Sequence, residues 1–188
     1  MKKLSFFLVL LFLGNMNIPL QAQWQQTFGP FGWTAMHLAS GDGFVYSSGG
    51  KIFRSSDNGM TWEEKSNGIW QWDADAIFVS NTRVFAGMFD GSGAGSGYLY
   101  YSDDHGESWV QHNTTGNSSP ITGFTKIDSN LFFSTYNNSV FVSSDNGETW
   151  TKTPGLEIPD SPYPHIYCIT SVGDYLFFGG NDGLFRSI

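Results

Sequence analysis

Three kinds of residue are scarce in this sequence of 188 residues. A single cysteine, Cys168, excludes a disulfide within the chain, and its apolar neighbours predict a buried, unreactive thiol. Only 9 lysines and arginines stand against 17 acids, for a net charge of -8. Nucleic acid is therefore not an expected partner, because its binding rests on neutralising phosphates. The 4 histidines lack the spacing of metal ligands, so we expect no metal and no cofactor.

Long apolar runs are also missing, apart from one near the start of the chain. Two lysines come first, and an apolar run from Leu4 to Leu13 follows. This run is shorter than the about 20 residues that span a bilayer. A basic start, a short apolar core and a small residue at Ala22 are typical of a secretory signal peptide. We predict a signal peptide at residues 1–22, a secreted (extracellular or periplasmic) chain over 23–188, and no membrane insertion after cleavage.

The sequence does contain one short motif in three copies, Ser-x-Asp-x-Gly-x-Thr/Ser-Trp. The copies recur at intervals of about 40 to 50 residues, which indicates a repeated supersecondary unit. Glycine accepts a positive φ, the aspartate accepts hydrogen bonds in its own turn, and the tryptophan buries a large apolar area. We therefore predict structural and not catalytic roles in hairpins. The motif residues are Ser55, Asp57, Gly59, Thr61, Trp62, Ser102, Asp104, Gly106, Ser108, Trp109, Ser143, Asp145, Gly147, Thr149 and Trp150.

Short β-branched and aromatic runs separate the motifs, and each complete unit holds four of them. Four-stranded units of this length are β-propeller blades. The predicted fold class is all-β, a β-propeller of four-stranded antiparallel blades, three complete plus one split or truncated. The last unit has three predicted strands and ends at Ser187. Either Trp24 supplies its fourth strand in a closed four-bladed ring, which we expect to be monomeric, or the chain is part of a longer propeller.

The motif resembles the Asp box, or BNR repeat, and residues 23–188 resemble Asp-box propellers. These include sialidases, sortilin-type domains, some xyloglucan hydrolases and photosystem II assembly factors. The resemblance implies that the Asp boxes lie away from any active site, so that function belongs to the opposite rim. A sialidase site is not expected. It needs three converging arginines and an Arg-Ile-Pro element, whereas Arg54 and Arg186 here occupy the same Phe-Arg-Ser position in two blades.

Candidate binding residues fall in the loops predicted to form the opposite rim, where aromatic rings can stack on sugars and carboxylates can bind hydroxyls. No catalytic residue is identified. Each candidate has a structural alternative, namely packing between blades, an idle glycine-rich insertion or a stiff proline-rich linker. The sequence favours a binding or scaffold module that recognises a glycan or a protein. The alternative is a partial glycoside hydrolase, sialidase- or xyloglucanase-like, without a recognisable complete active site. The candidates are Trp70, Trp72, Asp73, Asp75, Asp90, Tyr163 and His165.

Overall fold

A computed structural model describes the fold, and all regular structure in the described residues is β-strand. Three antiparallel sheets have four strands each and the last has three. The predicted all-β propeller of four-stranded blades is confirmed. The described residues are 25–30, 35–69, 73–91, 96–113, 119–154 and 165–187.

Each sheet is one blade, and its strands follow one another in chain order from one edge to the other. Blades 1 and 2 contain β1 (Ala35–Gly41), β2 (Phe44–Gly49), β3 (Ile52–Ser55), β4 (Glu63–Glu64), β5 (Asp73–Ser80), β6 (Arg83–Phe89), β7 (Gly97–Ser102) and β8 (Val110–His112). Blades 3 and 4 contain β9 (Ile121–Ile127), β10 (Asn130–Thr135), β11 (Ser139–Ser143), β12 (Thr151–Lys152), β13 (Ile166–Val172), β14 (Tyr175–Gly180) and β15 (Gly183–Arg186).

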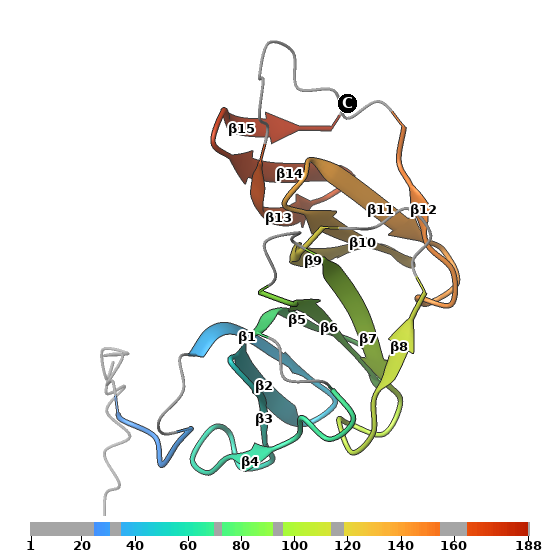
Figure 1. Ribbon diagram of the computed structural model, residues 1–188. Coiled ribbons are helices and arrows are strands. Elements are labelled where there is room, and N and C mark those ends of the chain that lie inside the picture. The colour runs from blue at the N-terminus through green and yellow to red at the C-terminus, as the bar shows by residue number, and fades with distance from the viewer. Residues whose placement is uncertain are drawn as a thin grey trace, which may run out of the picture.

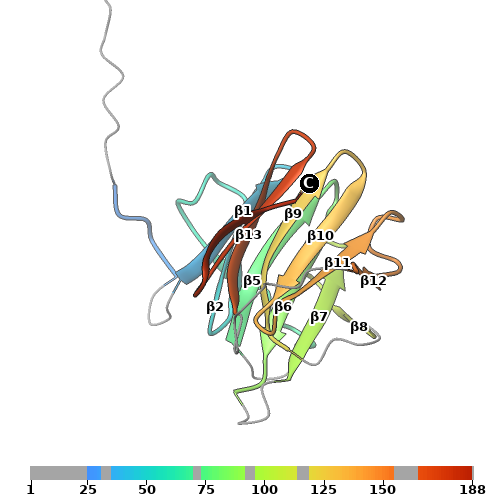
Figure 2. The same cartoon turned by 90° about the horizontal axis from the view of Figure 1, so that it is seen from above.

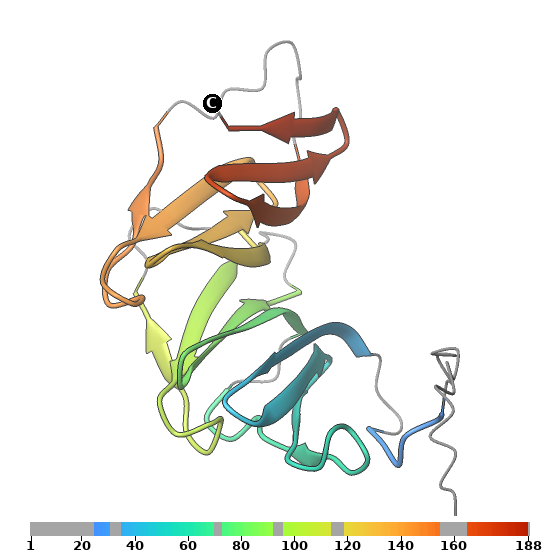
Figure 3. The same cartoon turned by 180° about the vertical axis from the view of Figure 1, so that it is seen from behind.

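The blades fan around one side of a common axis (Figure 1). The first strands of neighbouring blades are in contact, β1 with β5, β5 with β9 and β9 with β13. They gather on one side of the molecule in Figure 2, and the short last strands β8 and β12 lie on the other. Blades 1 and 4 lie at opposite ends of this arc, as the view from behind also shows (Figure 3). The first strands therefore line the axis.

The hydrophobic core consists of three clusters, one in each junction between neighbouring blades. Tyr46 and Ile52 of blade 1 meet Ile77 of blade 2 in the first cluster. In the second, the Phe85 ring of blade 2 lies edge-on to Trp150 of blade 3, with ring centroids 6.0 Å apart. A blade alone would leave both faces of its sheet apolar. Stacking the units buries these faces, which is why the pattern recurs along the chain.

The fourth strand of blade 4 remains a prediction, because Trp24 lies outside the described residues. The nearby described segment, residues 25–30, lies against blade 1. There the amide of Phe28 donates a hydrogen bond to the carbonyl of Met60 at 3.0 Å, and Phe28 forms a bridge with Thr61. Blade 4 has the strands β13, β14 and β15 in the described part of the chain.

Candidate functional site

The three motif hairpins share one hydrogen-bond pattern. In the first, the Ser55 hydroxyl donates to Asp57 Oδ1 at 2.7 Å and accepts from the Gly59 amide at 2.8 Å. Asp57 also accepts from the Thr61 amide at 2.8 Å and from the Thr61 hydroxyl at 2.6 Å. The Thr61 hydroxyl and amide lower the pKa of Asp57 to about 2. A carboxylate held in this way is fully ionised and closes the hairpin.

Positive φ angles explain why glycine stands in each motif. Asn58 has φ 59° and Gly59 has φ 86°, and the same pair of left-handed residues recurs at positions 105–106 and 146–147. Side chains tolerate φ near 60° only at a cost, and asparagine tolerates it best. The three carboxylates belong to three separate hairpins, and each is satisfied within its own turn.

Arginines join neighbouring blades on the Asp-box rim. Arg54 of blade 1 donates to the carbonyl of His105 at 2.9 Å and pairs with Glu107 of blade 2 at 2.9 Å. Arg83 of blade 2 makes a forked contact with Asp103 and pairs with Glu148 of blade 3 at 2.7 Å. Arg54 and Arg83 therefore each tie one blade to the next.

A pocket of about 340 Å³ also lies on the Asp-box rim, between blades 2 and 3. Its lining is small and polar apart from one lysine and the motif carboxylate, which its own turn already satisfies. This rim is therefore occupied mainly by structural contacts. The lining residues are Ser80, Asn81, Lys126, Ser129, Ser144, Asp145 and Asn146.

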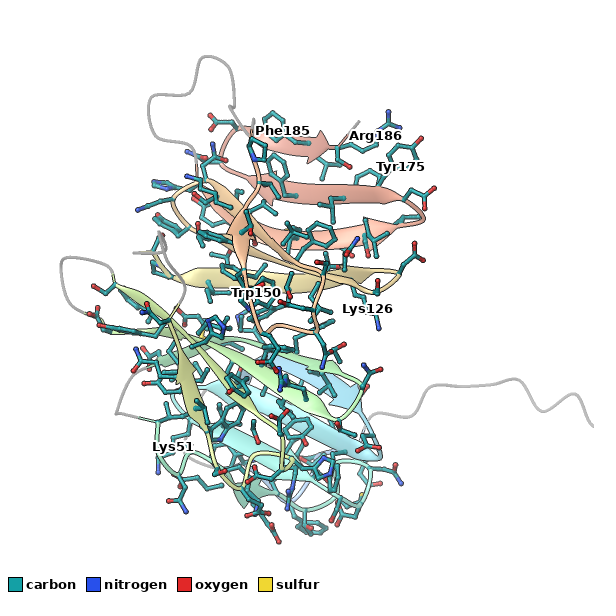
Figure 4. The ribbon with its side chains drawn as sticks, turned by 90° about the vertical axis from the view of Figure 1, so that its right-hand side faces the viewer. Lys51, Lys126, Trp150, Tyr175, Phe185 and Arg186 are labelled. Atoms are coloured by element: carbon teal, nitrogen blue, oxygen red, sulfur yellow. The ribbon has the colours of Figure 1, made fainter. Side chains whose placement is uncertain are left out.

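The opposite rim is formed by the loops after the second strand of each blade and by the connections between blades. Figure 4 shows the two rims at opposite ends of the strands, with Lys51 of the β2–β3 loop on one side and Lys126 and Tyr175 on the other. Four of the seven predicted binding residues are described by the structure. Asp73 and Asp75 stand at the start of β5, Asp90 follows β6, and His165 precedes β13.

Every blade carries a β-bulge in its first strand near this opposite rim. The register with the second strand shifts by one residue in all four sheets. A bulge leaves one residue unpaired and turns its side chain away from the regular alternation. Because the first strands line the axis, the bulges supply four side chains that differ from blade to blade. The sequence pattern gave no sign of them. They are Met36, Asp75, Thr122 and Tyr167.

The bulge in blade 2 holds a carboxyl group with an unusual affinity for protons. Burial, and then the neighbouring charge of Asp73, raise the pKa of Asp75 to about 6. Asp73 itself is exposed. Asp90, at the end of β6, is 8% exposed, and its amide donates to the Ser96 carbonyl at 3.2 Å. Blade 2 therefore offers one exposed acidic side chain, Asp73, and one carboxyl group whose pKa is raised, Asp75.

Three aromatic side chains meet where blade 3 joins blade 4. We call Tyr136, His165 and Tyr167 the aromatic cluster. The rings of Tyr136 and His165 are stacked, with centroids 4.0 Å apart and planes at 15°, and Tyr167 lies 6.0 Å from Tyr136. The Asn181 side chain accepts a hydrogen bond from the His165 amide at 2.9 Å, which fixes this corner. Tyr136 is 37% and Tyr167 53% exposed. The cluster therefore offers aromatic surface to solvent.

The sequence predicted His165 but missed both of its aromatic partners. Tyr136 stands in the loop after β10, and Tyr167 is the bulge residue of blade 4, so only the fold brings them together. The structure places Asp73 and Asp75 in blade 2 and His165 at the junction of blades 3 and 4, with β9 between them. Trp70, Trp72 and Tyr163 lie outside the described residues.

Cys168 was predicted to be buried, and this prediction is wrong: its side chain is exposed. Cys168 pairs with Gly179 and occupies the position of Ala76 in blade 2, which is 2% exposed in the core. Ala76 is covered by blade 3, whereas blade 4 is the last blade described. In the described part of the chain, no group of three or more acidic, histidine or cysteine side chains is placed to hold a metal ion. The same residues contain no helix long and apolar enough to cross a membrane.

Comparisons with known proteins agree with this geometry. The family model for the BNR/Asp-box repeat matches residues 100–111 and 141–152. A xyloglucanase of Hypocrea jecorina (strain QM6a) is 29% identical over 143 residues, which are 74% of this chain and 14% of the enzyme. Vacuolar protein sorting/targeting protein 10 of Fusarium vanettenii is 31% identical over 101 residues, 50% of this chain and 6% of that protein. The chain therefore spans a small part of these relatives.

Solved structures show the same fold at low sequence identity. The computationally designed Ika4 protein matches with a TM-score of 0.61 and 14% identity, over 89% of this chain and 98% of that one. YCF48 bound to D1 peptide matches with 0.56 and 16%, over 82% and 50%. The GH74 enzyme of Niastella koreensis matches with 0.58 and 18%, over 82% and 28%. The chain thus carries BNR/Asp-box repeats on the blades of a β-propeller.

Proposed function

We propose that this chain is an exported binding module, secreted to the extracellular or periplasmic space, whose rim opposite the Asp boxes recognises a glycan. The aromatic cluster is the observation that carries the proposal, because it offers two part-exposed tyrosine rings on that rim. The apolar segment near the start of the chain supports export. The similarity to a xyloglucanase supports a polysaccharide as the class of ligand.

The chemistry of binding follows from the two kinds of side chain on the rim. Aromatic rings bury apolar area at a low cost in conformational entropy, and a sugar ring presents an apolar face of C–H groups to them. The carboxylate of Asp73 accepts hydrogen bonds from hydroxyl groups. Tyr136 and His165 hold each other in place before any ligand arrives, which lowers the entropy lost on binding.

A protein segment is the alternative ligand on the same rim. The relatives that favour it are the vacuolar protein sorting/targeting protein and YCF48 bound to D1 peptide. An extended polypeptide would use the same tyrosine rings and would pair its basic side chains with the acidic surface. The glycan is preferred because the carboxylates of blade 2 and the cluster of blades 3 and 4 are separate, as expected for successive subsites along a chain of sugars.

A glycoside hydrolase is the second candidate function, favoured by the pair of carboxyl groups on β5. The Asp75 carboxyl group, whose pKa is raised by burial, can donate a proton to a leaving group. Xyloglucanase and GH74 enzymes are among the similar proteins. In such an enzyme, replacing Asp75 by Asn would abolish the release of reducing sugar, and a binding module would release none in either form.

Calorimetric titration with xyloglucan and with cello-oligosaccharides tests the binding proposal. We expect Tyr167→Ala to weaken binding at least about tenfold, which is about 1.4 kcal/mol. The matched control is Phe28→Ala, which removes an aromatic ring that is 67% exposed beside the Asp box of blade 1. Equal affinity of the two variants and the wild type would exclude the cluster as the site. Binding of basic peptides in place of glycans would favour the protein ligand.

A further inference from the structure

The two ends of the arc expose the two halves of a blade junction. Figures 1 and 3 show blade 1 at one end and blade 4 at the other. On blade 1, Leu38 is 70% exposed, and on blade 4, Val172 and Leu184 are 65% and 76% exposed. We call the sheet face around Leu38 the end face of blade 1, and the face around Val172 and Leu184 the end face of blade 4. Single exposed apolar side chains are common, but these three lie on faces that a neighbouring blade covers at the three junctions within the chain.

The position of Leu184 is buried in each of the other blades. The strand pairings align it with Ile52, Leu99 and Val140, which are 0%, 0% and 3% exposed. Each of these residues faces the following blade and belongs to a cluster that the following blade completes. Leu184 therefore stands where an apolar side chain belongs to a junction.

The position of Leu38 supplies the other half of the same contact. The pairings align it with Ile77, Phe124 and Ile169. Ile77 shares a cluster with Ile52, and Ile169 shares one with Val140. A blade 1 placed after blade 4 would therefore bring Leu38 onto Leu184, as Ile169 meets Val140 within the chain.

Side-chain size at the turn ends also fits this junction. Two aligned positions at the turn ends of the first strands face each other across a junction. Between blades 1 and 2 they hold the small Gly41 and the branched Val79. Between blades 3 and 4 they hold the branched Ile127 and the small Ser171. A Cβ on Gly41 would approach Val79 Cγ1 to 2.5 Å, which shows that the two positions touch. At a junction between the end faces, the pair is Val172 with Ser40. One large and one small residue again face each other, as close packing requires.

A polar contact of the first junction is also ready at the end face of blade 4. In blade 1, the Arg54 guanidinium lies 4.8 Å above the Phe44 ring and donates to a carbonyl in the Asp box of blade 2. In blade 4, Arg186 lies 4.7 Å above the Tyr175 ring, and Figure 4 shows the two side by side. Arg54 donates to the carbonyl of His105 in the Asp box of blade 2. The equivalent residue in the Asp box of blade 1 is Asn58, which has the same left-handed backbone conformation. Its carbonyl is the acceptor for Arg186 at a junction between the end faces.

We propose that a second copy of this chain covers both end faces, blade 4 of each copy stacking on blade 1 of the other to close one ring of eight blades. Head-to-tail contacts of this kind generate a closed ring when the rotation per unit permits. The first strands line one common axis and the blades occupy one side of it, which leaves the other side for a partner of the same shape (Figure 1). This arrangement replaces the monomer expected from a closed four-bladed ring.

Mass measurement in solution tests the proposal directly. Light scattering after size exclusion should give twice the chain mass for the wild type, constant over a hundredfold range of concentration. A single chain mass throughout, or a mass that rises without limit with concentration, would overturn the closed pair. The readout needs no variant and no ligand.

A charge complementation experiment tests the register of the junction. Leu38→Arg and Leu184→Glu should each give half the wild-type mass, because each substitution places one unpaired charge in each of the two junctions. An equimolar mixture should recover the double mass, since one junction then holds Arg against Glu and the other is unchanged. Val110→Arg, at an apolar residue of β8 that is 51% exposed, is the control and should keep the double mass. Near-ultraviolet circular dichroism establishes that each variant is folded. Folded variants that fail to associate on mixing would refute the assigned contact.

Discussion

Replacing the motif glycines by alanine separates two effects that the repeat normally combines. Gly59 and Gly147 have φ 86° and 85°, so alanine pays the same backbone strain at both. We take this cost as about 1–2 kcal/mol. Their surroundings differ. A Cβ on Gly59 would meet only the Trp62 ring, at 3.7 Å, whereas a Cβ on Gly147 would approach two carbons of the Phe85 ring to 2.4 and 2.5 Å.

Phe85 is fully buried in the junction of blades 2 and 3, so a shift of its ring displaces its neighbours in the core. Overpacking a closed core costs about 1–3 kcal/mol beyond the backbone strain. We therefore expect Gly147→Ala to lower the free energy of unfolding by about 1–3 kcal/mol more than Gly59→Ala does. With an urea slope of about 2 kcal/mol/M, the two midpoints should differ by about 0.5–1.5 M.

Equilibrium unfolding in urea, followed by tryptophan fluorescence and far-ultraviolet circular dichroism, measures this difference. Coincident transitions by the two probes are required before the midpoints are converted into free energies. Gly106→Ala should fall between the two variants, because its Cβ would lie 3.3 Å from Lys65 Cβ, closer than the contact at Gly59 and less close than that at Gly147. Equal midpoints for Gly59→Ala and Gly147→Ala would refute the reasoning, because they would mean that the junction yields without cost.

Three further predictions concern charged groups. The Asp-box carboxylates have folded pKa values of about 2, below the unfolded value. Their contribution to stability is therefore present above about pH 4 and should be lost as the pH falls towards 2. Urea midpoints measured across this pH range check the prediction. Asp75 has the opposite shift, a raised pKa, so folding disfavours its ionised form. Asp75→Asn should therefore stabilise the chain above pH 6, and this gain in stability should vanish below about pH 4. A gain of equal size at both pH values would contradict this origin. Arg83→Ala should lower the free energy of unfolding by about 1–3 kcal/mol, and with it the melting temperature, because Glu148 and Asp103 lose a shared partner. Arg83→Lys should be intermediate, since lysine keeps the charge but cannot make the forked contact. Equal melting temperatures would show that this link between blades contributes nothing to stability.

Much of the fold followed from the sequence because the signals are local. An Asp-x-Gly turn marks where two strands reverse, and the short β-branched and aromatic runs between these turns mark the strands. The three complete units and the three-stranded last unit were therefore predicted from the chain alone. The assignment of Arg54 and Arg186 to one repeated position was also correct in its geometry, since both lie above an aromatic ring of the second strand.

The candidate site was less predictable because its members are distant in the chain. His165 and the carboxyls of β5 stand in loops or strand ends that composition could single out. Tyr136 and Tyr167 reach the same corner only because β10 of blade 3 lies beside β13 of blade 4 and because a bulge turns Tyr167 outward. A bulge has no sequence signature here, since the four residues that occupy it have nothing in common.

The sequence by itself determined the repeat, the hairpins and the identity of each blade strand, because these depend on backbone conformations within a few residues. Only the tertiary structure decided which face of each strand is covered, since burial depends on the neighbouring blade and not on the residue. Cys168 illustrates the difference: its strand is as apolar as that of Ala76, yet it is exposed because no blade of the described chain follows blade 4.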